Sequence, residues 1–261
     1  MILDEIVTAK RAELKRSKHE RKIVDLKAKA RNAAPVPPFD LRQKDAVSII
    51  AEVKRASPVK GVLKADLDPA KQALAYKEGG ARAISVLTDR EFFKGSVDDL
   101  RAARDASGLP VLRKDFIIDE YQLWEAKVMR ASAALLIVRI LDKPQLRDYI
   151  ALAREELKLA TLVEVHSEKE LEAALDAKAA VVGINNRDLD TFQVTLETTA
   201  RLRELLPADV VSVSESGISK REDIVLLHQM KVDAALIGEE LVKAADPAAK
   251  IRELLGVAGG G

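Results

Sequence analysis

The chain has 261 residues, a length that suits one large domain or two small ones. Hydrophobic residues make up 48% and charged residues 33%, and the formal net charge of +1 gives no general attraction to nucleic acid or to a membrane surface. There is no cysteine, which excludes disulfides, thiolate metal sites and cysteine nucleophiles. No apolar run approaches the roughly 18 residues of a membrane span, and the N-terminus lacks a signal-peptide apolar core. We therefore expect a cytoplasmic protein with no nucleic-acid or membrane partner.

The first 47 residues are predicted to form an N-terminal helical extension. The basic stretch from Lys10 to Lys22 contains Glu13 and Glu20 and no aromatic residue, which favours a solvated helix face over a nucleic-acid arm. Prolines in PVPPF (35–39) stop helix propagation. Because the segment is too short to bury its own core, we expect it to pack on the rest of one domain, residues 1–261.

From residue 48 onward, short apolar segments alternate with amphipathic stretches of helical period. Continuous short apolar runs are typical of strands buried on both faces. The predicted strands are 48–53, 82–87, 110–115, 134–140, 160–165, 180–185, 209–214 and 234–238. The clearest predicted helices are 95–106, 142–157, 167–178 and 219–231. Ser167 and Ser219 each lie three residues before a glutamate, a spacing that predicts helix N-caps.

Eight strands that each lead into a helix predict the α/β class and a (β/α)8 TIM barrel. An open, doubly wound sheet is the alternative. That fold seldom uses eight such even units, and it would place a glycine-rich dinucleotide turn after its first strand, where this chain has SPVKG. The barrel is favoured.

Polar side chains end five of the predicted strands. Since residues two apart on a strand share a face, Glu52 and Lys54 point the same way. In a barrel, the C-terminal strand ends form the active-site rim, so these side chains converge in one mouth. The candidate catalytic residues are Glu52, Lys54, Lys114, Glu164, Asn185, Arg187 and Glu215.

This mixture of charges predicts acid and base chemistry. A lysine desolvated beside another cation has a lowered pKa and becomes a usable general acid near neutral pH. A glutamate near a lysine stays ionised and can act as a base, and a lysine or arginine can hold a substrate carboxylate.

The last two strand–helix loops predict a phosphate site. SGIS (216–219) and IGEEL (237–241) each place a glycine shortly before a helix, where barrels commonly bind phosphate through backbone N–H groups. We expect Gly217 and Gly238 to supply these groups. No metal site is expected, because the three histidines have no ligand spacing.

Seven motifs, one for each of seven strands, carry a resemblance to a known family. They are IIAEVKRASPVKG, AISVLTDREFFKGS, VLRKDFIIDEYQ, LLIVRIL, LVEVHSEKEL, GINNRDL and VSESGIS. Together they resemble indole-3-glycerol phosphate synthase, from the extension to about residue 255. The resemblance implies a lyase of tryptophan biosynthesis that acts on a small phosphorylated substrate without a cofactor. It would close 1-(2-carboxyphenylamino)-1-deoxyribulose 5-phosphate to indole-3-glycerol phosphate, with loss of CO₂ and water.

The same resemblance implies roles for individual residues. Lys114 is similar to the general acid, Glu164 to the acid/base glutamate, and Asn185 to the amide that orients it. Lys54 is similar to the lysine that meets the substrate carboxylate, with Glu52 as its partner, while Arg187 and Glu215 complete the polar ring. The implied substrate-binding residues are Ser57, Pro58, Phe93, Phe116, Leu135, Ser216, Gly217, Gly238 and Glu239, of which Pro58, Leu135 and the two phenylalanines form an apolar wall.

The chain departs from the family pattern at three turns where glycine is usual. It has Met129-Arg130-Ala131-Ser132, Ala177-Lys178-Ala179 and Met230-Lys231-Val232 at these points, on the face of the barrel away from the chemistry.

Three other functions compete with this one. The first is phosphoribosylanthranilate isomerase, whose chemistry resembles that of a cysteine/aspartate pair. Because the chain has no cysteine, this function is excluded. A Schiff-base aldolase stays open, because Lys54 and Lys114 are candidate amines. A non-catalytic or stability-altered barrel of the same family is the alternative from a different class, and the expected oligomeric state is a monomer.

Overall fold

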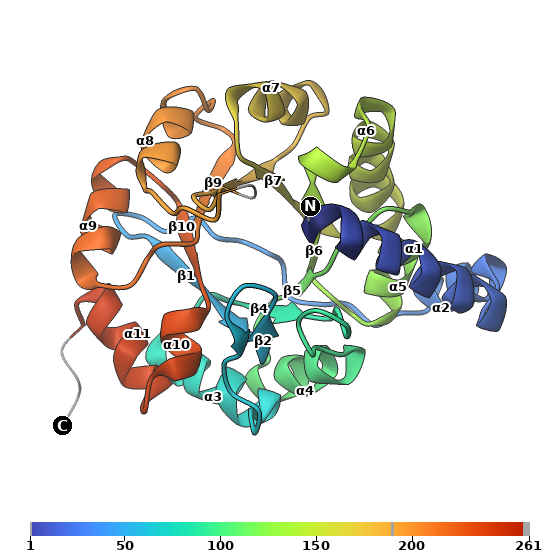
Figure 1. Cartoon of the computed structure of the whole chain (residues 1–261), viewed down its shortest axis with the longest axis horizontal. Coiled ribbons are helices and arrows are strands. Elements are labelled where there is room, and N and C mark those ends of the chain that lie inside the picture. The colour runs from blue at the N-terminus through green and yellow to red at the C-terminus, as the bar shows by residue number, and fades with distance from the viewer. Residues whose placement is uncertain (1, 189–190, 258–261) are drawn as a thin grey trace.

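The computed structural model describes residues 2–188 and 191–257, and within them eight parallel strands close into a barrel (Figure 1). The strand order is β1-β10-β9-β8-β7-β6-β5-β4. The strands are β1 (Ser48–Val53), β4 (Ala83–Leu87), β5 (Val111–Lys114), β6 (Ala133–Ile137), β7 (Ala160–Val165), β8 (Val181–Asn185), β9 (Val211–Glu215) and β10 (Ala234–Ile237). The predicted (β/α)8 TIM barrel is confirmed, and the open sheet is excluded. Met1 and the final leucine of GINNRDL lie outside the described residues.

The first and last barrel strands close the sheet against each other. β1 pairs with β4 through Ile50↔Ala83, and with β10 through Ser48↔Ala234. One face of each strand fills the barrel interior and the other packs against the helices, which explains the continuous apolar runs. The interior cluster contains Leu41, Ile50, Ala83, Leu112, Ala133, Leu135, Ile137, Leu162, Val181, Val213, Ala234 and Leu236.

Helices surround the barrel between successive strands, as Figure 1 shows. They are α3 (Pro69–Gly79), α4 (Val97–Ser107), α5 (Glu120–Val128), α6 (Lys143–Ala151), α7 (Glu168–Asp176), α8 (Glu197–Glu204), α9 (Arg221–Gln229), α10 (Glu239–Lys243) and α11 (Pro247–Leu255). Shorter elements are the hairpin β2 (Ala56–Ser57) and β3 (Gly61–Val62), the 3₁₀ turn η1 (Val138–Ile140) and the π-helical turn η2 (Leu152–Leu157). None of the described helices is long and apolar enough to cross a membrane.

One of the two predicted helix caps is confirmed. The Ser167 hydroxyl accepts the backbone N–H of Glu170 at the start of α7. The prediction for Ser219 is wrong, because α9 begins at Arg221 after the N-cap residue Lys220. There the carboxylate of Asp223 accepts the N–H groups of Ser219 and Lys220 instead. A negative charge in the first helical turn is also favoured by the helix dipole.

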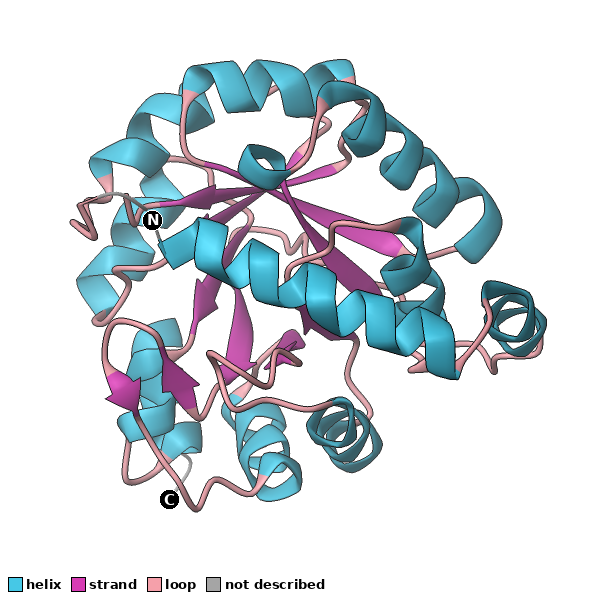
Figure 2. Ribbon diagram, turned by 45° about the vertical axis from the view of Figure 1, so that its right-hand side comes forward, coloured by secondary structure: helices cyan, strands magenta, loops and turns pink. Residues whose placement is uncertain are grey.

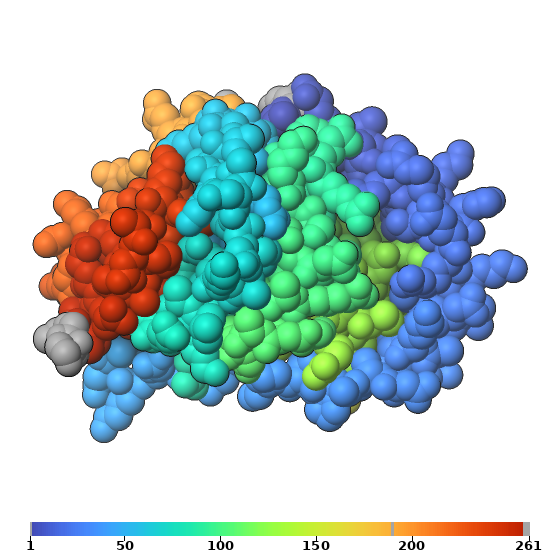
Figure 3. Space-filling model, turned by 90° about the horizontal axis from the view of Figure 1, so that it is seen from below, coloured from blue at the N-terminus to red at the C-terminus, as the bar shows by residue number. Residues whose placement is uncertain are grey.

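The N-terminal extension contacts both ends of the barrel. It contains α1 (Ile2–Glu20) and α2 (Ile23–Arg31), and Figure 2 shows α1 crossing in front of the strands. The linker that follows reaches the opposite end, where Leu41 joins the interior cluster and Arg42 donates to the carbonyl of Ala208. Figure 3 shows these N-terminal residues, in blue, along the right side and lower edge of one face.

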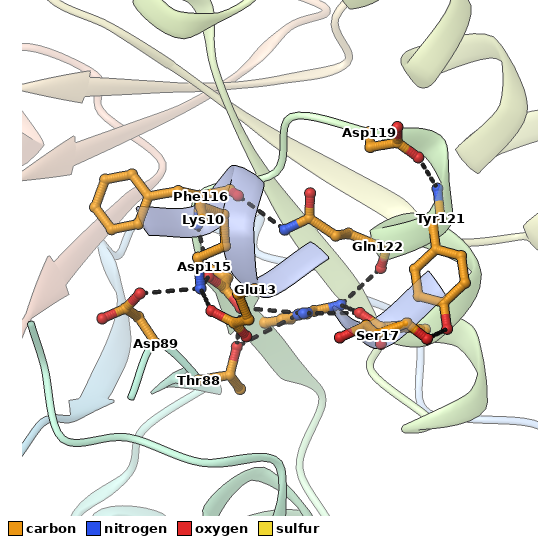
Figure 4. A network of polar contacts seen from close by, with 12 residues as sticks. Lys10, Glu13, Ser17, Thr88, Asp89, Asp115, Phe116, Asp119, Tyr121 and Gln122 are labelled. Atoms are coloured by element: carbon orange, nitrogen blue, oxygen red, sulfur yellow. Dashed lines mark hydrogen bonds and ion pairs between the residues drawn. The ribbon is translucent and has the colours of Figure 1, made fainter. Parts of the chain in front are cut away.

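A buried group of charges holds α1 on the barrel (Figure 4). The Lys10 Nζ lies 2.9 Å from Asp89 and 3.0 Å from Asp115, which follow β4 and β5. Arg113 donates to the second oxygen of Asp115 over 3.1 Å. We call Lys10, Asp89, Asp115 and Arg113 the anchor cluster. Because Lys10 is only 2% exposed, the predicted solvated face is wrong at this residue.

The three turns that lack the usual glycine adopt left-handed backbone. Arg130, Lys178 and Lys231 have φ of 60°, 64° and 58°, directly before β6, β8 and β10. The turns before β4 and β5 use Gly80 and Gly108 for the same conformation. A side chain in this conformation costs about 1–2 kcal/mol, so these turns carry backbone strain at the N-terminal ends of the strands.

Candidate active site

A cavity of ≈ 460 Å³ lies at the C-terminal ends of the strands, and every residue predicted for the site lines it. Residues on or just after all eight barrel strands contribute to it. The N-terminal extension adds three side chains from the first turns of α1, which are Ile2, Leu3 and Ile6. The structure thus brings together, in one place, side chains that the sequence distributes over almost the whole chain.

Lys114 lies at the centre of the polar group. Its Nζ is 2.7 Å from Glu215 Oε2 and 3.3 Å from Glu164 Oε2. Burial alone would lower the pKa of Lys114, but the carboxylates of Glu215 and Glu164 outweigh it and raise the pKa above its ordinary value. The expectation of a lysine pKa lowered by a neighbouring cation is therefore wrong for Lys114, because its nearest charged neighbours are carboxylates.

Glu164 is held ionised, as predicted for a base. Burial would raise its pKa, but Lys114 and His166 outweigh this and lower the pKa below its usual value. The Asn185 amide donates to Glu164 Oε1 over 3.3 Å. In turn, Asn185 Oδ1 accepts from the hydroxyl of Ser216 at 2.9 Å and from the N–H of Arg187 at 3.0 Å. These bonds fix which way the amide of Asn185 faces.

Glu215 is the carboxylate of this group that is least well paired. Burial raises its pKa to about 7, in spite of the Lys114 ammonium beside it. Its Oε1 has no hydrogen-bond partner among the described residues. A Cβ on Gly183 would lie only 2.1 Å from this oxygen, so the glycine in β8 makes room for the carboxylate. We call Lys114, Glu164, Asn185 and Glu215 the mouth cluster.

The pair at the end of β1 forms a second ionic contact. Lys54 Nζ lies 2.7 Å from Glu52 Oε1, and the two side chains share the inner face as their spacing predicts. A Cβ on Gly238 would lie 2.5 Å from Glu52 Oε1 and 3.2 Å from Lys54 Nζ. Gly238 therefore has a second role that the sequence did not predict, which is to leave space for this ion pair.

The two glycine loops differ from each other in geometry. Gly238 is the N-cap residue of α10, as predicted, whereas Gly217 lies four residues before α9 begins. Ser216 and Gly217 have consecutive left-handed φ values of 68° and 80°. Two successive residues of this kind form a concave turn in which backbone N–H groups can converge on an anion.

Glu239, the acid in the second loop, is neutralised by lysines. Its Oε1 lies 2.7 Å from Lys60 Nζ and 2.6 Å from Lys243 Nζ. Partial burial would raise the pKa of Glu239, but Lys243 and Lys60 outweigh it and lower the pKa to about 2. The Lys60 contact also ties the turn between β2 and β3 to the first residue of α10.

An apolar surface faces the charges across the cavity. The rings of Phe93 and Phe116 lie 5.9 Å apart and tilted by 36°. Pro58 and Leu135 line the same cavity, as predicted. The three apolar residues of α1 extend this surface.

Two polar residues near the site were not predicted. Asn186 is 1% exposed and donates to Ser214 Oγ and to the carbonyls of Glu215 and Ser216, which fixes the loop after β9. His166 follows β7 on the same face as Glu164, and the parity used for the strand ends would have found it. Within the described part of the chain, no group of three or more His, Asp or Glu side chains could hold a metal ion.

Comparison with known proteins identifies the family of the chain. The family model described as indole-3-glycerol phosphate synthase matches residues 3–254. A protein of that name from Dehalococcoides mccartyi is 46% identical over 98% of this chain and 100% of its own length. Another from Acetivibrio thermocellus is 47% identical with the same coverage.

Solved structures with lower identity share the fold. The 3-hexulose-6-phosphate synthase from Salmonella typhimurium has a TM-score of 0.64 at 13% identity, over 80% of this chain and 97% of that chain. A thiamine phosphate pyrophosphorylase from Pyrococcus furiosus has a TM-score of 0.59 at 17% identity, over 80% and 94%. The fold alone is common to these enzymes, but the family match and the similarity over nearly the full length are specific. This chain belongs to the indole-3-glycerol phosphate synthase family.

Proposed function

We propose that this chain converts 1-(2-carboxyphenylamino)-1-deoxyribulose 5-phosphate to indole-3-glycerol phosphate, with loss of CO₂ and water, as a carboxy-lyase of tryptophan biosynthesis. Membership of the family supports this reaction. The observation in the structure that carries it is Lys114, held between two carboxylates in a cavity with an apolar wall.

In the ring-closing step, Lys114 acts on the carbonyl oxygen of the substrate. Its raised pKa keeps the ammonium protonated at neutral pH. As the ring carbon attacks the carbonyl carbon, negative charge develops on the oxygen, and the ammonium donates a hydrogen bond and then a proton to it. The resulting hydroxyl is the group that later leaves as water.

The carboxylate on the aromatic ring leaves as CO₂ and its electron pair restores the ring. Lys54 holds this carboxylate before it leaves, with Glu52 fixing the lysine at 2.7 Å. Arg187, which follows β8, is a second cation for the substrate anions. Burial in the cavity favours the loss of charge, because CO₂ needs no solvation shell.

In the last step, Glu164 removes a proton from the carbon next to the former carbonyl carbon. The hydroxyl is protonated and departs as water. The lowered pKa of Glu164 supports its ionised, basic form. Asn185 holds its orientation through the 3.3 Å hydrogen bond. Glu215, with a pKa of about 7, can carry a proton between Lys114 and the leaving hydroxyl near neutral pH.

Substrate binding divides the cavity into two parts. The aromatic ring lies against Phe93 and Phe116, with Pro58 and Leu135 beside them. The phosphate meets backbone N–H groups of Ser216, Gly217, Gly238 and Glu239, with Ser57 near it.

A fluorescence assay for indole-3-glycerol phosphate, started with the synthetic substrate, tests this function. Product at a rate that depends on Lys114 is expected, and no product from folded protein would favour the non-catalytic barrel. Borohydride added during turnover separates the aldolase, because only an imine mechanism leaves a covalent adduct on Lys54 or Lys114. An adduct on either lysine would favour the aldolase, and an adduct on Lys114 would overturn its proposed acid role.

Three further expectations accompany the reaction. The chain works as a single domain, residues 1–261, in which residues 1–47 are a helical extension packed on the barrel, and as a cytoplasmic monomer. Sulfate or inorganic phosphate should compete with the substrate by occupying the N–H groups around Gly217 and Gly238. Kinetics without such competition would contradict the phosphate assignment.

A further inference from the structure

His166 is buried beside the proposed base, yet it has no part in the reaction described above. It follows β7 and its side chain is 9% exposed. Its Nε2 lies 3.5 Å from Glu164 Oε1 and makes no hydrogen bond to any described residue. A buried ring nitrogen without a partner is costly, so its position next to Glu164 needs an explanation.

The opposite side of the imidazole is fixed by α7. Nδ1 lies 3.2 Å from Glu170 Oε2, and the same oxygen accepts the backbone N–H of His166 over 2.7 Å. Glu170 itself is placed by the Ser167 cap, whose hydroxyl accepts its N–H. The ring therefore cannot turn away from Glu164 without losing the contact with Glu170.

The charges that face His166 come from three elements. They are Glu164 on β7, Glu170 on α7 and Glu215 on β9, with Lys114 on β5 beyond the two inner carboxylates. Burial would lower the pKa of His166, but Glu170 and Glu164 outweigh it and raise the pKa above its ordinary value. A protonated imidazole donates from both nitrogens, one toward Glu170 and one toward Glu164.

The two oxygens of Glu164 have different neighbours. Lys114 lies against Oε2, at 3.3 Å, whereas Asn185 and His166 lie against Oε1, at 3.3 Å and 3.5 Å. When Lys114 turns to the substrate carbonyl, Oε2 loses its cation. The Oε1 side then has to keep the carboxylate in place and charged.

We propose that His166 is a positioning residue, which holds Glu164 through Oε1 while Lys114 acts on the substrate. The inference rests on the proposed role of Glu164 as the base. Glu170 is the second part of this device, because it aims the imidazole. His166 does not line the cavity, so the effect on catalysis passes through Glu164 rather than through substrate contact.

Steady-state kinetics of His166→Phe and His166→Gln test this inference. The phenylalanine variant should lose about 10- to 100-fold in kcat, since misplacing a catalytic group by about 1 Å can cost this much, while KM stays near the wild-type value. The glutamine variant keeps an N–H near the position of Nε2 without the charge, so it should recover much of kcat. We expect the wild-type kcat to fall as rising pH deprotonates His166, and the glutamine variant should not show this fall. His228→Gln, at an exposed histidine, is the matched control.

Nuclear magnetic resonance titration of His166 gives a readout that needs no substrate. We expect its pKa to lie above the ordinary imidazole value of about 6.5, and Glu170→Gln to lower it. A pKa of His166 at or below the ordinary imidazole value, or wild-type kcat and pH profile in folded His166→Phe, would overturn the inference. If His166→Phe does not fold, the glutamine variant and the titration decide. Absence of product from the wild type would overturn the proposed function alone, because the titration still decides whether His166 carries charge beside Glu164.

Discussion

Three consecutive residues at the end of β5 belong to two different buried ion groups. Lys114 points into the barrel and joins the mouth cluster, whereas Arg113 and Asp115 point outward and join the anchor cluster under α1. Alternation along the strand produces this division. Each group contains a lysine that touches at least two carboxylates, and both lysines are largely shielded from solvent.

The two clusters differ in how completely their polar atoms are paired. In the anchor cluster, both oxygens of Asp89 and both of Asp115 have partners from Lys10, Arg113, Thr88 or backbone N–H groups. In the mouth cluster, Glu215 Oε1 has none among the described residues, and its pKa is raised to about 7. A fully paired network stabilises one structure, while a partly paired one keeps atoms and protons free for a ligand.

The largest effect is expected from Lys114→Ala in the mouth cluster. Loss of a positioned general acid typically costs about 10² to 10⁴ in rate, so kcat should collapse while KM stays near the wild-type value. Lys54→Ala should instead raise KM as well, if that ammonium holds the substrate carboxylate. Steady-state kinetics with circular dichroism as the folding check measure both. Retention of more than about a tenth of wild-type kcat in Lys114→Ala, outside the range for a catalytic acid, would remove Lys114 from that role.

Lys10→Met in the anchor cluster should act mainly on stability. It leaves two buried carboxylates without their shared cation, a change that typically costs about 3–5 kcal/mol in unfolding free energy. KM should also rise, because Ile2, Leu3 and Ile6 of α1 line the cavity.

Lys18→Met is the matched control for Lys10→Met. Lys18 lies on the same helix and pairs with Asp119 at 2.7 Å, but its side chain is 44% exposed, so its loss should cost less than about 1 kcal/mol. Because the pKa of Lys10 is raised above its unfolded value, its contribution is fully present below that value and should be equal at pH 5 and pH 8. Urea unfolding at both pH values is the measurement. Equal losses in the two variants would mean that burial of Lys10 does not matter.

Glu215→Gln should remove a pH dependence of stability. A carboxyl group whose pKa is raised in the folded state stabilises the fold fully at pH values below its unfolded-state pKa of 4.5. This contribution is lost as the pH rises through about 7. The wild type should therefore lose on the order of 2 kcal/mol between pH 5 and pH 8 that the glutamine variant does not lose. Parallel stability curves for the two proteins would show that Glu215 is as well paired as the anchor carboxylates.

The smallest effect is expected at the left-handed turns, which lie outside both clusters. Lys231→Gly relieves the strain of a side chain at φ 58° and should gain about 0.5–1 kcal/mol after the entropy cost of glycine. The reciprocal change, Gly108→Ala at φ 65°, should lose about 1 kcal/mol, and its Cβ meets no close atom. Thermal unfolding measures both, and kcat should not change in either variant. A loss in Lys231→Gly would mean that its side chain makes contacts worth more than the strain.

The alternation of side chains along each strand, or strand parity, predicted most of the site. In a barrel, alternate residues of a strand point into the interior, so their sequence positions indicate which side chains face it. Strand parity placed Glu52, Lys54, Lys114 and Glu164 in one mouth. It could not predict the pKa of Lys114, since this depends on Glu215 and Glu164, which come from other strands. Lys10 was missed for the same reason, because its partners Asp89 and Asp115 approach only when α1 packs on the barrel.

Local sequence signals for strand ends and helix caps were less reliable than the strand–helix repeat. The apolar run at 134–140 was predicted as one strand, but β6 ends at Ile137 and the chain turns into η1. Apolar composition alone does not separate a strand from a 3₁₀ turn. The Ser219 cap failed because a nearby carboxylate provided a stronger acceptor.

The pairing of β1 with β10 has a consequence for synthesis on the ribosome. Residues 48–51 leave the exit tunnel before the other seven barrel strands, but the partners that cover that edge, residues 234–237, emerge after all of them. Gly238, which borders Glu52 and Lys54, arrives with these partners. A nascent chain therefore carries an open strand edge until β10 has been made, and such edges invite pairing with other chains. Enzyme activity can begin only after that strand has emerged.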